Sequence, residues 1–317
     1  MDLSIVISLY NEEESIPELL SWIERALASQ KLAYEIILVD DGSTDNSWEV
    51  IKRESSQYRT ISAIRFSRNY GKSPALFIGF EAAKGDVVVT MDADLQDNPE
   101  EIPELYEMIA NQGYDLVSGW KKRRKDNKLA KNLPSKIYNR VARRVTGLKL
   151  HDMNCGLKAY RKEVVKNIEV YGEMHRYIPY LAKIAGFRNI GEKVVKHQAR
   201  KFGKSKFGMD RFVNGFLDLI TLWFLSKFGK RPMHFFGTFG TLTFFFGFVT
   251  AVYLVADKLI SQASGLKFRQ VTDQPLFYIS LVALIIGMQL FLAGFLGELV
   301  SRNSSERNNY KIKERLN

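Results

Sequence analysis

Asp92 and Asp94, two aspartates with the spacing of a metal site, follow an apolar run at residues 87–91. Neighbouring residues of a strand point to opposite faces, but a turn at the strand's end can direct both carboxylates to one point. Carboxylate oxygens in that position suit Mg²⁺ or Mn²⁺, which stay partly hydrated and bridge to substrate phosphates. An ordinary turn that closes a strand uses the same residue types. The pair by itself leaves a metal site and a structural turn both open.

The stretches around this pair are predicted to alternate between strands and helices. Apolar, β-branched runs predict strands at residues 3–9, 35–39, 61–66, 86–91 and 114–118. Stretches of helical length separate these strands, and such alternation indicates an α/β domain with a mainly parallel sheet. Ligands of these sheets bind beyond the carboxyl ends of the strands. The aspartate pair is therefore expected at a ligand-binding edge.

Polar side chains follow four of the predicted strands in succession. They are Asn11 and Glu12, Asp40 and Asp41, Arg68 and Asn69, and Asp92 and Asp94. Because these strand ends meet at one edge, we expect a binding crevice there. Neither Gly-x-Gly-x-x-Gly nor Gly-x-x-x-x-Gly-Lys-Ser/Thr occurs, which argues against a dinucleotide-binding dehydrogenase and a P-loop NTPase. A phosphate-bearing ligand would then need a metal ion and basic side chains.

The C-terminal third contains two long apolar segments, residues 235–256 and 276–300, in a chain of 317 residues. Each is about twenty residues long, which is enough to cross a bilayer's hydrocarbon. The first has no charged residue and the second has only Glu298. A buried helix of a soluble protein is the alternative. Length and composition favour two membrane spans.

The distribution of charge predicts an orientation for these spans. Lys and Arg residues gather before the first and after the second, which favours both flanks in the cytoplasm and the connecting residues 257–275 outside. The chain starts without a basic signal-peptide region, and Cys155 is its only cysteine, as expected in a reducing compartment. The formal net charge is +11. With two spans, anionic lipid is a better partner than nucleic acid.

Three short segments, in their order along the chain, resemble the motifs of a known family. Residues 8–12 read Ser-Leu-Tyr-Asn-Glu, residues 39–45 read Val-Asp-Asp-Gly-Ser-Thr-Asp, and residues 92–96 read Asp-Ala-Asp-Leu-Gln. Together they resemble the signature of family 2 glycosyltransferases, which implies a GT-A fold, a Rossmann-like α/β domain with a mainly parallel sheet. With the two apolar segments, nearly the whole chain resembles the polyprenyl-phosphate glycosyltransferases, which include dolichol-phosphate mannose synthases and bacterial GtrB-type glucosyltransferases.

The resemblance implies roles for individual residues. The nucleotide sugar would be bound by Tyr10, Asn11, Glu12, Asp40, Arg68, Asn69, Lys72, Asp92, Gln96, Lys204 and Ser205. Asp92 and Asp94 would hold Mg²⁺ or Mn²⁺ against the diphosphate, with Asp94 as the firmer ligand. Arg200 would stabilise the leaving diphosphate. Asp94, Asp152 and Arg200 form the expected catalytic set.

The acceptor side is less sharply defined by the sequence. The resemblance implies that the lipid phosphate meets Lys121, Arg123, Lys131 and Ser135. The basic run at residues 121–125 could equally be a solvated loop. Asp152 would orient the acceptor or act as a base, or else cap a turn. Cys155 is expected to be a packing residue.

The expected organisation is a catalytic domain at residues 1–207, an interfacial amphipathic helix within 208–232, and a membrane region at 233–317. Gln198 is not followed by the Arg-Trp of processive synthases, so we expect transfer of a single sugar. The resemblance implies an inverting enzyme of the cytoplasmic membrane with its catalytic domain in the cytosol. This enzyme would move a hexose to undecaprenyl phosphate, and UDP-glucose is the preferred donor. A GDP-mannose or modified-arabinose donor is the alternative within the enzyme class, and a non-catalytic lipid carrier or scaffold is the alternative class. The resemblance also suggests a homo-oligomer, and a tetramer is the preferred state.

Overall fold

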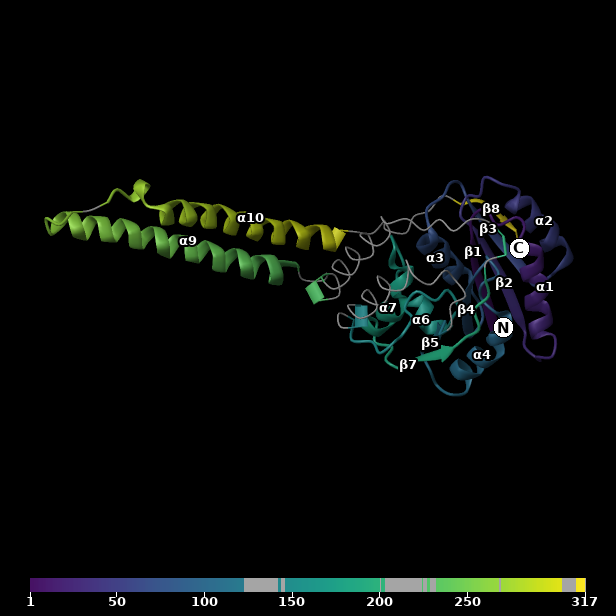
Figure 1. Cartoon of the computed structure of the whole chain (residues 1–317). Helices are drawn as coiled ribbons and strands as arrows, with labels where there is room; N and C mark the ends of the chain where they lie inside the picture. Colours follow the sequence, from purple (N-terminus) through teal and green to yellow (C-terminus); the bar gives the residue numbers. More distant parts are fainter. Residues whose placement is uncertain are drawn as a thin grey trace. The chain divides into compact units, whose positions relative to one another are not determined.

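The computed structural model describes residues 1–122, 142–143, 146–199, 201–202, 224, 227–228, 232–267, 269–303 and 312–316. The chain forms two compact units, shown in Figure 1. One consists of Met1–Leu219 together with Asn308–Asn317, and the other is Ile220–Arg307. Each unit is described by itself below.

The first unit is built on an eight-stranded sheet. Its strands are β1 (Leu3–Leu9), β2 (Tyr34–Asp40), β3 (Ile61–Phe66), β4 (Val87–Asp92), β5 (Leu116–Trp120), β6 (Lys158–Arg161), β7 (Ile190–Val194) and β8 (Ile312–Leu316). They lie in the order β7-β5-β6-β4-β1-β2-β3-β8. The strands β1 to β4 are parallel, β6 runs antiparallel between β4 and β5, and β8 is antiparallel to β3. The carboxyl ends of β1 to β5 therefore share one edge.

Helices cover both faces of this sheet (Figure 1). They are α1 (Ile16–Leu27), α2 (Ser47–Gln57), α3 (Lys72–Ala82), α4 (Ile102–Ala110), α6 (Lys162–Lys166) and α7 (Ile178–Ile184), with short 3₁₀ turns at η1 (Pro99–Glu101) and η2 (Met174–Tyr177). A Cβ on Gly79 of α3 would lie 2.3 Å from Val6 Cγ1 in β1, so α3 approaches the sheet closely.

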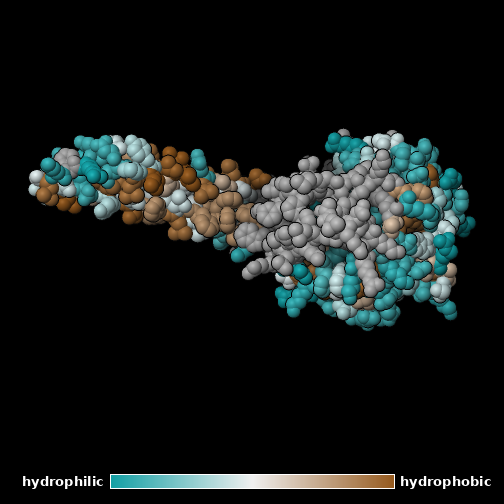
Figure 2. All heavy atoms as spheres, viewed as in Figure 1, coloured by the Kyte–Doolittle hydropathy of each residue, from teal (hydrophilic) through white to brown (hydrophobic). Residues whose placement is uncertain are grey.

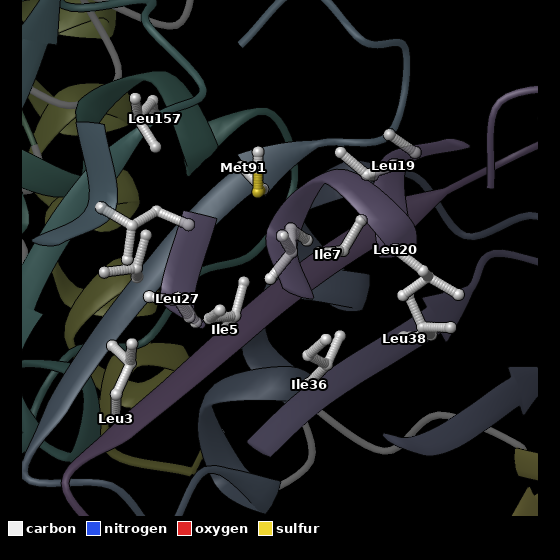
Figure 3. Packing of buried hydrophobic residues seen from close by; sticks show 14 of the residues in the cluster. Leu3, Ile5, Ile7, Leu19, Leu20, Leu27, Ile36, Leu38, Met91 and Leu157 are labelled. Carbon is white, nitrogen blue, oxygen red and sulfur yellow. The ribbon is translucent and has the colours of Figure 1, made fainter. Parts of the chain in front are cut away.

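The main core lies between the sheet and α1 (Figure 3). Leu19, Leu20 and Leu27 lie on the buried face of α1, at helical spacing. They pack with Ile5 and Ile7, the β1 residues whose side chains alternate to that face. Each such buried side chain contributes about 1.5–3 kcal/mol to stability. This core fixes the sheet and thereby the edge at its carboxyl ends.

The five predicted strands and the mainly parallel α/β arrangement are confirmed, with strand bounds differing by at most two residues. The strands β6, β7 and β8 were not predicted. The reason is their composition, since β6 has Lys158 in place of an apolar residue and β8 reads Ile-Lys-Glu-Arg-Leu. Only pairing with a neighbouring strand makes these segments extended.

The second unit contains two long helices, α9 (Pro232–Ala263) and α10 (Pro275–Asn303), joined through η3 (Val271–Asp273). Glycines let the two backbones meet. A Cβ on Gly240 would lie 2.7 Å from the carbonyl oxygen of Gly287, and one on Gly247 would lie 2.6 Å from that of Ser280. Small residues of this kind permit the close helix packing seen in membrane proteins.

Both helices are long and apolar enough to cross a membrane, in agreement with the predicted segments. Their most apolar windows have mean hydropathies of 1.9 and 2.4, and only 17% and 22% of those windows is buried. Figure 2 shows apolar residues over much of the visible surface of the pair and hydrophilic residues at the end where the two helices are connected. A core helix of a soluble protein would be mostly covered. Most of the predicted interfacial helix within 208–232 lies outside the described residues.

Candidate active site

The loops that follow β1 and β2 are joined by hydrogen bonds at the carboxyl edge of the sheet. The backbone N–H of Asn11 donates to Ser43 Oγ at 2.9 Å, and that of Thr44 donates to Asn11 Oδ1 at 2.8 Å. The N–H of Glu12 donates to Ser47 Oγ at 2.9 Å. Asn11 also has a positive φ of 55°, which Asn tolerates better than most residues. Asn11, through its backbone and its side chain, and Glu12, through its backbone, thus join the two loops.

Asp41 joins the loop after β2 to the loop after β3. Its carboxylate accepts hydrogen bonds from the N–H groups of Tyr70, at 2.7 Å, and Gly71, at 2.9 Å. Burial raises the pKa of Asp41 to about 6 in spite of these bonds. Gly42 has a φ of +71°, and a Cβ there would lie 2.4 Å from the carbonyl carbon of Arg68. Only glycine permits this approach, which explains the Asp-Asp-Gly sequence.

Asp40, the last residue of β2, is completely buried. Its Oδ1 accepts the N–H of Ser43 at 2.8 Å, and its Oδ2 lies 3.3 Å from Arg65 Nε. Oδ2 accepts no hydrogen bond of good geometry from the described residues. Burial raises the pKa of Asp40, while Ser43 and Arg65 act in the opposite direction. A buried carboxylate oxygen with spare acceptor capacity can receive an N–H from a ligand.

The Asp-Ala-Asp-Leu-Gln turn is held in an unusual conformation. Leu95 has a positive φ of 61° although it is not glycine, and its side chain is buried. Asp94 Oδ1 accepts the N–H of Gln96 at 3.2 Å, and Asp97 Oδ2 accepts the N–H of Asp92 at 3.2 Å. Strained backbone of this kind persists where surrounding contacts enforce it. The turn thus places the carboxylate of Asp94 close in sequence to that of Asp92, the last residue of β4, at the edge of the sheet.

Lysine side chains surround Asp92. Lys72 Nζ contacts Asp92 Oδ1 directly, and Lys121 Nζ forms an ion pair with Asp97 Oδ1 at 2.8 Å. Lys158 is only 3% exposed, and burial lowers its pKa. Burial alone would raise the pKa of Asp92, but Lys72, Lys121 and Lys158 together lower it below its usual range. The site thus holds Asp92 ionised among cations, which is an environment suited to an anionic ligand.

The donor atoms present fit a divalent cation that takes oxygen ligands. Asp92 keeps 31% of its side chain exposed and already attracts a cation, the ammonium group of Lys72. The described residues contain no cluster of three or more His, Cys, Asp or Glu side chains that could hold a metal ion alone. Two carboxylates completed by phosphate oxygens form a set that Mg²⁺ commonly uses. Asp92 and Asp94 therefore suit a metal that arrives with a phosphate-bearing substrate.

The segment before β6 packs directly against Asp92. The hydroxyl of Thr90 donates to the carbonyl oxygen of Gly156 at 2.9 Å. A Cβ on Gly156 would lie 2.5 Å from Asp92 Oδ2. Glycine at this position is therefore required for the observed place of the carboxylate. The sequence offered no signal for this contact, because it joins residues far apart in the chain.

Asp152 is buried and takes part in a turn. Its Oδ1 accepts the N–H of Asn154 at 3.2 Å, and its own N–H donates to Glu192 Oε1 at 3.0 Å. These bonds are those of a turn cap, and the role of Asp152 toward an acceptor stays a prediction. Glu192 also binds His151, which stacks on Trp120 at the end of β5 with ring centroids 4.1 Å apart. These contacts join the segment before β6 to β7 and to Trp120, the residue that precedes Lys121 in the chain.

The segment that precedes Arg200 reaches the same edge. The N–H of Gln198 donates to the carbonyl oxygen of Gln96 at 3.0 Å, and His197 forms an isolated β-bridge with Asp97. This pairing places His197 and Gln198 beside the aspartate turn. Arg200 itself lies outside the described residues, as do other predicted site residues: Arg123, Lys131, Ser135, Lys204 and Ser205.

The remaining predicted residues lie in loops or at strand ends at this edge, except Lys72, which is the first residue of α3. They are Tyr10, Asn11, Glu12, Asp40, Arg68, Asn69, Lys72, Asp92, Asp94, Gln96, Lys121 and Asp152. Lys121 is 11% exposed and bound to Asp97, so its role toward a lipid phosphate stays a prediction. Sequence reasoning missed Asp97, Gly156 and Lys158. A lysine within the apolar run at residues 157–160 was the one local signal that could have revealed Lys158.

Known proteins are similar in sequence to this chain over most of its length. One is a dodecaprenyl-phosphate galacturonate synthase of Rhizobium johnstonii, 35% identical over 95% of this chain and 88% of that protein. Another is an undecaprenyl-phosphate 4-deoxy-4-formamido-L-arabinose transferase of Shewanella sediminis, 38% identical over 96% of this chain and 88% of that protein.

Solved structures share the fold at low sequence identity. Glucosyl-3-phosphoglycerate synthase of Mycobacterium tuberculosis, crystallised with Mn²⁺, UDP-glucose and phosphoglyceric acid, superimposes with a TM-score of 0.53 over 71% of this chain and 79% of that one, at 20% identity. Mannosyl-3-phosphoglycerate synthase of Rubrobacter xylanophilus gives a TM-score of 0.59 at 15% identity, over 72% and 75%. Residues 4–169 match the glycosyl transferase family 2 model. Given that match, the sheet and the aspartate turn at its edge, the chain belongs to glycosyl transferase family 2.

Proposed function

We propose that this glycosyltransferase moves one sugar from a nucleoside diphosphate donor to the phosphate of a polyprenyl lipid. The observation that carries the proposal is the Asp92–Asp94 turn with Lys72, Lys121 and Lys158 gathered around its first carboxylate. Such a site can neutralise a diphosphate leaving group. The relatives described above are named for sugar transfer to dodecaprenyl or undecaprenyl phosphate, and they cover nearly the whole chain.

For the donor we propose a uridine diphosphate sugar. Asp40 Oδ2 is a buried acceptor with spare capacity, which suits an N–H of a nucleobase. A uracil ring and a guanine ring both carry such a group, so GDP-mannose belongs in the test. The sequence favoured glucose, whereas the relatives are named for galacturonate and 4-deoxy-4-formamido-L-arabinose. We therefore place these two sugars ahead of glucose.

In the proposed reaction, an oxygen of the lipid phosphate forms a bond to the anomeric carbon while the bond from that carbon to the diphosphate oxygen breaks. The electron pair leaves with the nucleoside diphosphate, and attack from the opposite side inverts the configuration. A phosphate monoester has a second pKa of about 6, so it attacks without a strong base. This chemistry agrees with Asp152 serving as a turn cap.

The protein's own residues supply the charge complement for this step. Lys72 and Lys121 lie beside Asp92 and Asp97, where they can stabilise negative charge that develops on the diphosphate. Asp94 and Asp92 would hold Mg²⁺ or Mn²⁺, which would act as a Lewis acid toward the leaving group. Arg200 would complete the binding of the diphosphate, as the sequence predicts.

We also propose where the reaction takes place. The helices α9 and α10 would span the cytoplasmic membrane, with the catalytic unit and the C-terminal strand on the cytosolic side. A polyprenyl phosphate has its charged end at the membrane surface, where a tethered catalytic unit can reach it. The predicted domain division and oligomeric state stay predictions.

The test is transfer of radiolabelled sugar to undecaprenyl phosphate by the full-length protein in detergent, followed by lipid extraction. The panel holds UDP-galacturonate, UDP-4-deoxy-4-formamido-L-arabinose, UDP-glucose and GDP-mannose. We expect labelled lipid from one UDP-sugar, loss of labelling with EDTA and its return with Mn²⁺. Asp94→Asn is the matched inactive control. Labelling from GDP-mannose alone would overturn the uridine assignment, and no labelled lipid from any donor would refute the proposed activity.

A further inference from the structure

The last strand of the described chain, β8, lies at one edge of the sheet, next to β3. The strand β8 pairs antiparallel with β3, and Glu314 is directly opposite Arg65 in the register. Residues that face each other in an antiparallel pair carry their side chains on the same face of the sheet. Glu314 and Arg65 therefore share a face, although the two helices α9 and α10 separate them in the sequence.

A buried tryptophan of α2 lies between these two charged side chains. Trp48 is almost completely buried, and its Nε1–H donates to Glu314 Oε2 at 2.9 Å. The guanidinium of Arg65 lies over the indole ring, 5.7 Å from its centroid. Lys52 Nζ is 3.7 Å from Glu314 Oε1 and adds a second partner for that carboxylate. Glu314 thus orients the ring on which Arg65 rests.

Arg65 in turn contacts the loop that follows β2. Its Nη2 donates to the carbonyl oxygen of Ser43 at 3.1 Å, and its Nε lies 3.3 Å from Asp40 Oδ2. This buried oxygen accepts no hydrogen bond of good geometry from the described residues. Arg65 is the cation whose charge opposes the effect of burial on Asp40. Its position therefore decides how the Asp40 carboxylate is presented.

We propose that Glu314 and Trp48 are positioning residues for the donor site. Glu314 fixes the indole of Trp48, the indole limits the positions that the Arg65 guanidinium can take, and Arg65 holds Asp40 in its observed place. The inference rests on the proposed function, in which Asp40 accepts a hydrogen bond from the base of the donor. Removing the contact from β8 should weaken nucleotide binding and leave the chemical step unchanged.

The contact differs from a purely structural strap in what it controls. A strap that only covers the edge of β3 would change the stability of the fold without changing the affinity for nucleotide. A positioning contact changes the affinity for the base-bearing part of the donor, and so it changes KM more than kcat. The two roles can therefore be separated by measurement.

The experiment measures UDP binding in the presence of Mn²⁺ by calorimetry, together with kcat and KM for transfer, on the full-length protein in detergent. Trp48→Phe keeps an aromatic ring under Arg65 but removes the N–H that binds Glu314. Glu314→Ala removes the acceptor from the other side. Arg315→Ala is the matched control, because Arg315 is an exposed neighbour in the same strand.

We expect both Trp48→Phe and Glu314→Ala to raise the Kd for UDP about tenfold, which corresponds to weakening the hydrogen bond that Asp40 accepts from the base by about 1.4 kcal/mol. The double variant should be no weaker than the worse single variant, because both changes break one contact. Arg315→Ala should bind UDP like wild type, and kcat at saturating donor should stay within about twofold in Trp48→Phe.

The experiment distinguishes failure of the positioning role from failure of the proposed donor. Unchanged UDP affinity in both variants, with the wild type binding UDP normally, would overturn the positioning role even if thermal stability fell. Failure of the wild-type protein to bind UDP would instead overturn the proposed donor. A loss of kcat without a change in Kd would also contradict the inference, because it would place the effect on the chemical step.

Discussion

The contact between Gly156 and Asp92 allows a sharp prediction about catalysis. In Gly156→Ala, the new Cβ would lie 2.5 Å from Asp92 Oδ2, 2.6 Å from Cγ and 2.7 Å from Oδ1. Ordinary contact begins at 3.4 Å, so the carboxylate and the backbone of residue 156 must separate by a further 3.4 − 2.5 = 0.9 Å. Lys72 binds one oxygen of Asp92 and Asp97 binds the Asp92 backbone N–H, so the shift disturbs both contacts. A misplacement of about 1 Å can reduce turnover about 100-fold.

The assay is the initial rate of transfer to undecaprenyl phosphate, with Mn²⁺ binding followed in parallel by electron paramagnetic resonance. We expect about 100-fold slower transfer by Gly156→Ala and weaker Mn²⁺ binding in the presence of UDP. Gly172→Ala is the control, because a Cβ there meets nothing within 4 Å, although its φ of +54° makes alanine unfavourable. That variant should lose about 1 kcal/mol of stability and keep its activity. A wild-type rate for Gly156→Ala would refute the reasoning.

Three further predictions follow from the surroundings of Asp92. Lys72→Met removes the ammonium that binds this carboxylate, so Mn²⁺ binding without nucleotide should tighten about tenfold; unchanged binding in a titration would contradict the competition. Asp97→Ala leaves the buried end of Lys121 without its partner, and urea unfolding should show a loss of about 3 kcal/mol, whereas wild-type stability would show that the pair has no net effect. Burial, aided by Asp97, raises the pKa of Cys155 to about 12, so about one thiol in ten thousand is ionised at pH 8 and native protein should not react with a thiol reagent; reaction before unfolding would contradict its burial.

The parallel sheet and its binding edge could be predicted because their signals are local. Each of the first four strands is rich in apolar and β-branched residues and is followed by polar residues, so Asp40 and Asp92 can be placed at strand ends from the sequence. The helices α9 and α10 could likewise be predicted, from the length and the apolar composition of their segments. These features depend on neighbours within a few residues.

The contacts that tune the site could not be predicted in this way. Gly156 matters only because β6 inserts beside β4 in the opposite direction, and Trp48 meets Glu314 only because β8 pairs with β3. Asp97 looks like one more polar residue of a turn until its burial and its pairing with Lys121 are known. Each depends on which strands become neighbours. The donor sugar was likewise beyond local signals, and the glucose expected from the resemblance is not the sugar for which the relatives are named.

The place of β8 in the sheet has a consequence for how the chain can be threaded through a bilayer. Because β7 and β8 belong to one sheet, the segment between them, with α9 and α10, leaves the catalytic unit and returns to it. A segment that starts and ends in one folded body on one side of a bilayer must cross that bilayer an even number of times. The strand therefore excludes any arrangement in which one of the two helices crosses alone. In the proposed arrangement, two covalent connections join the first unit to the pair of spanning helices.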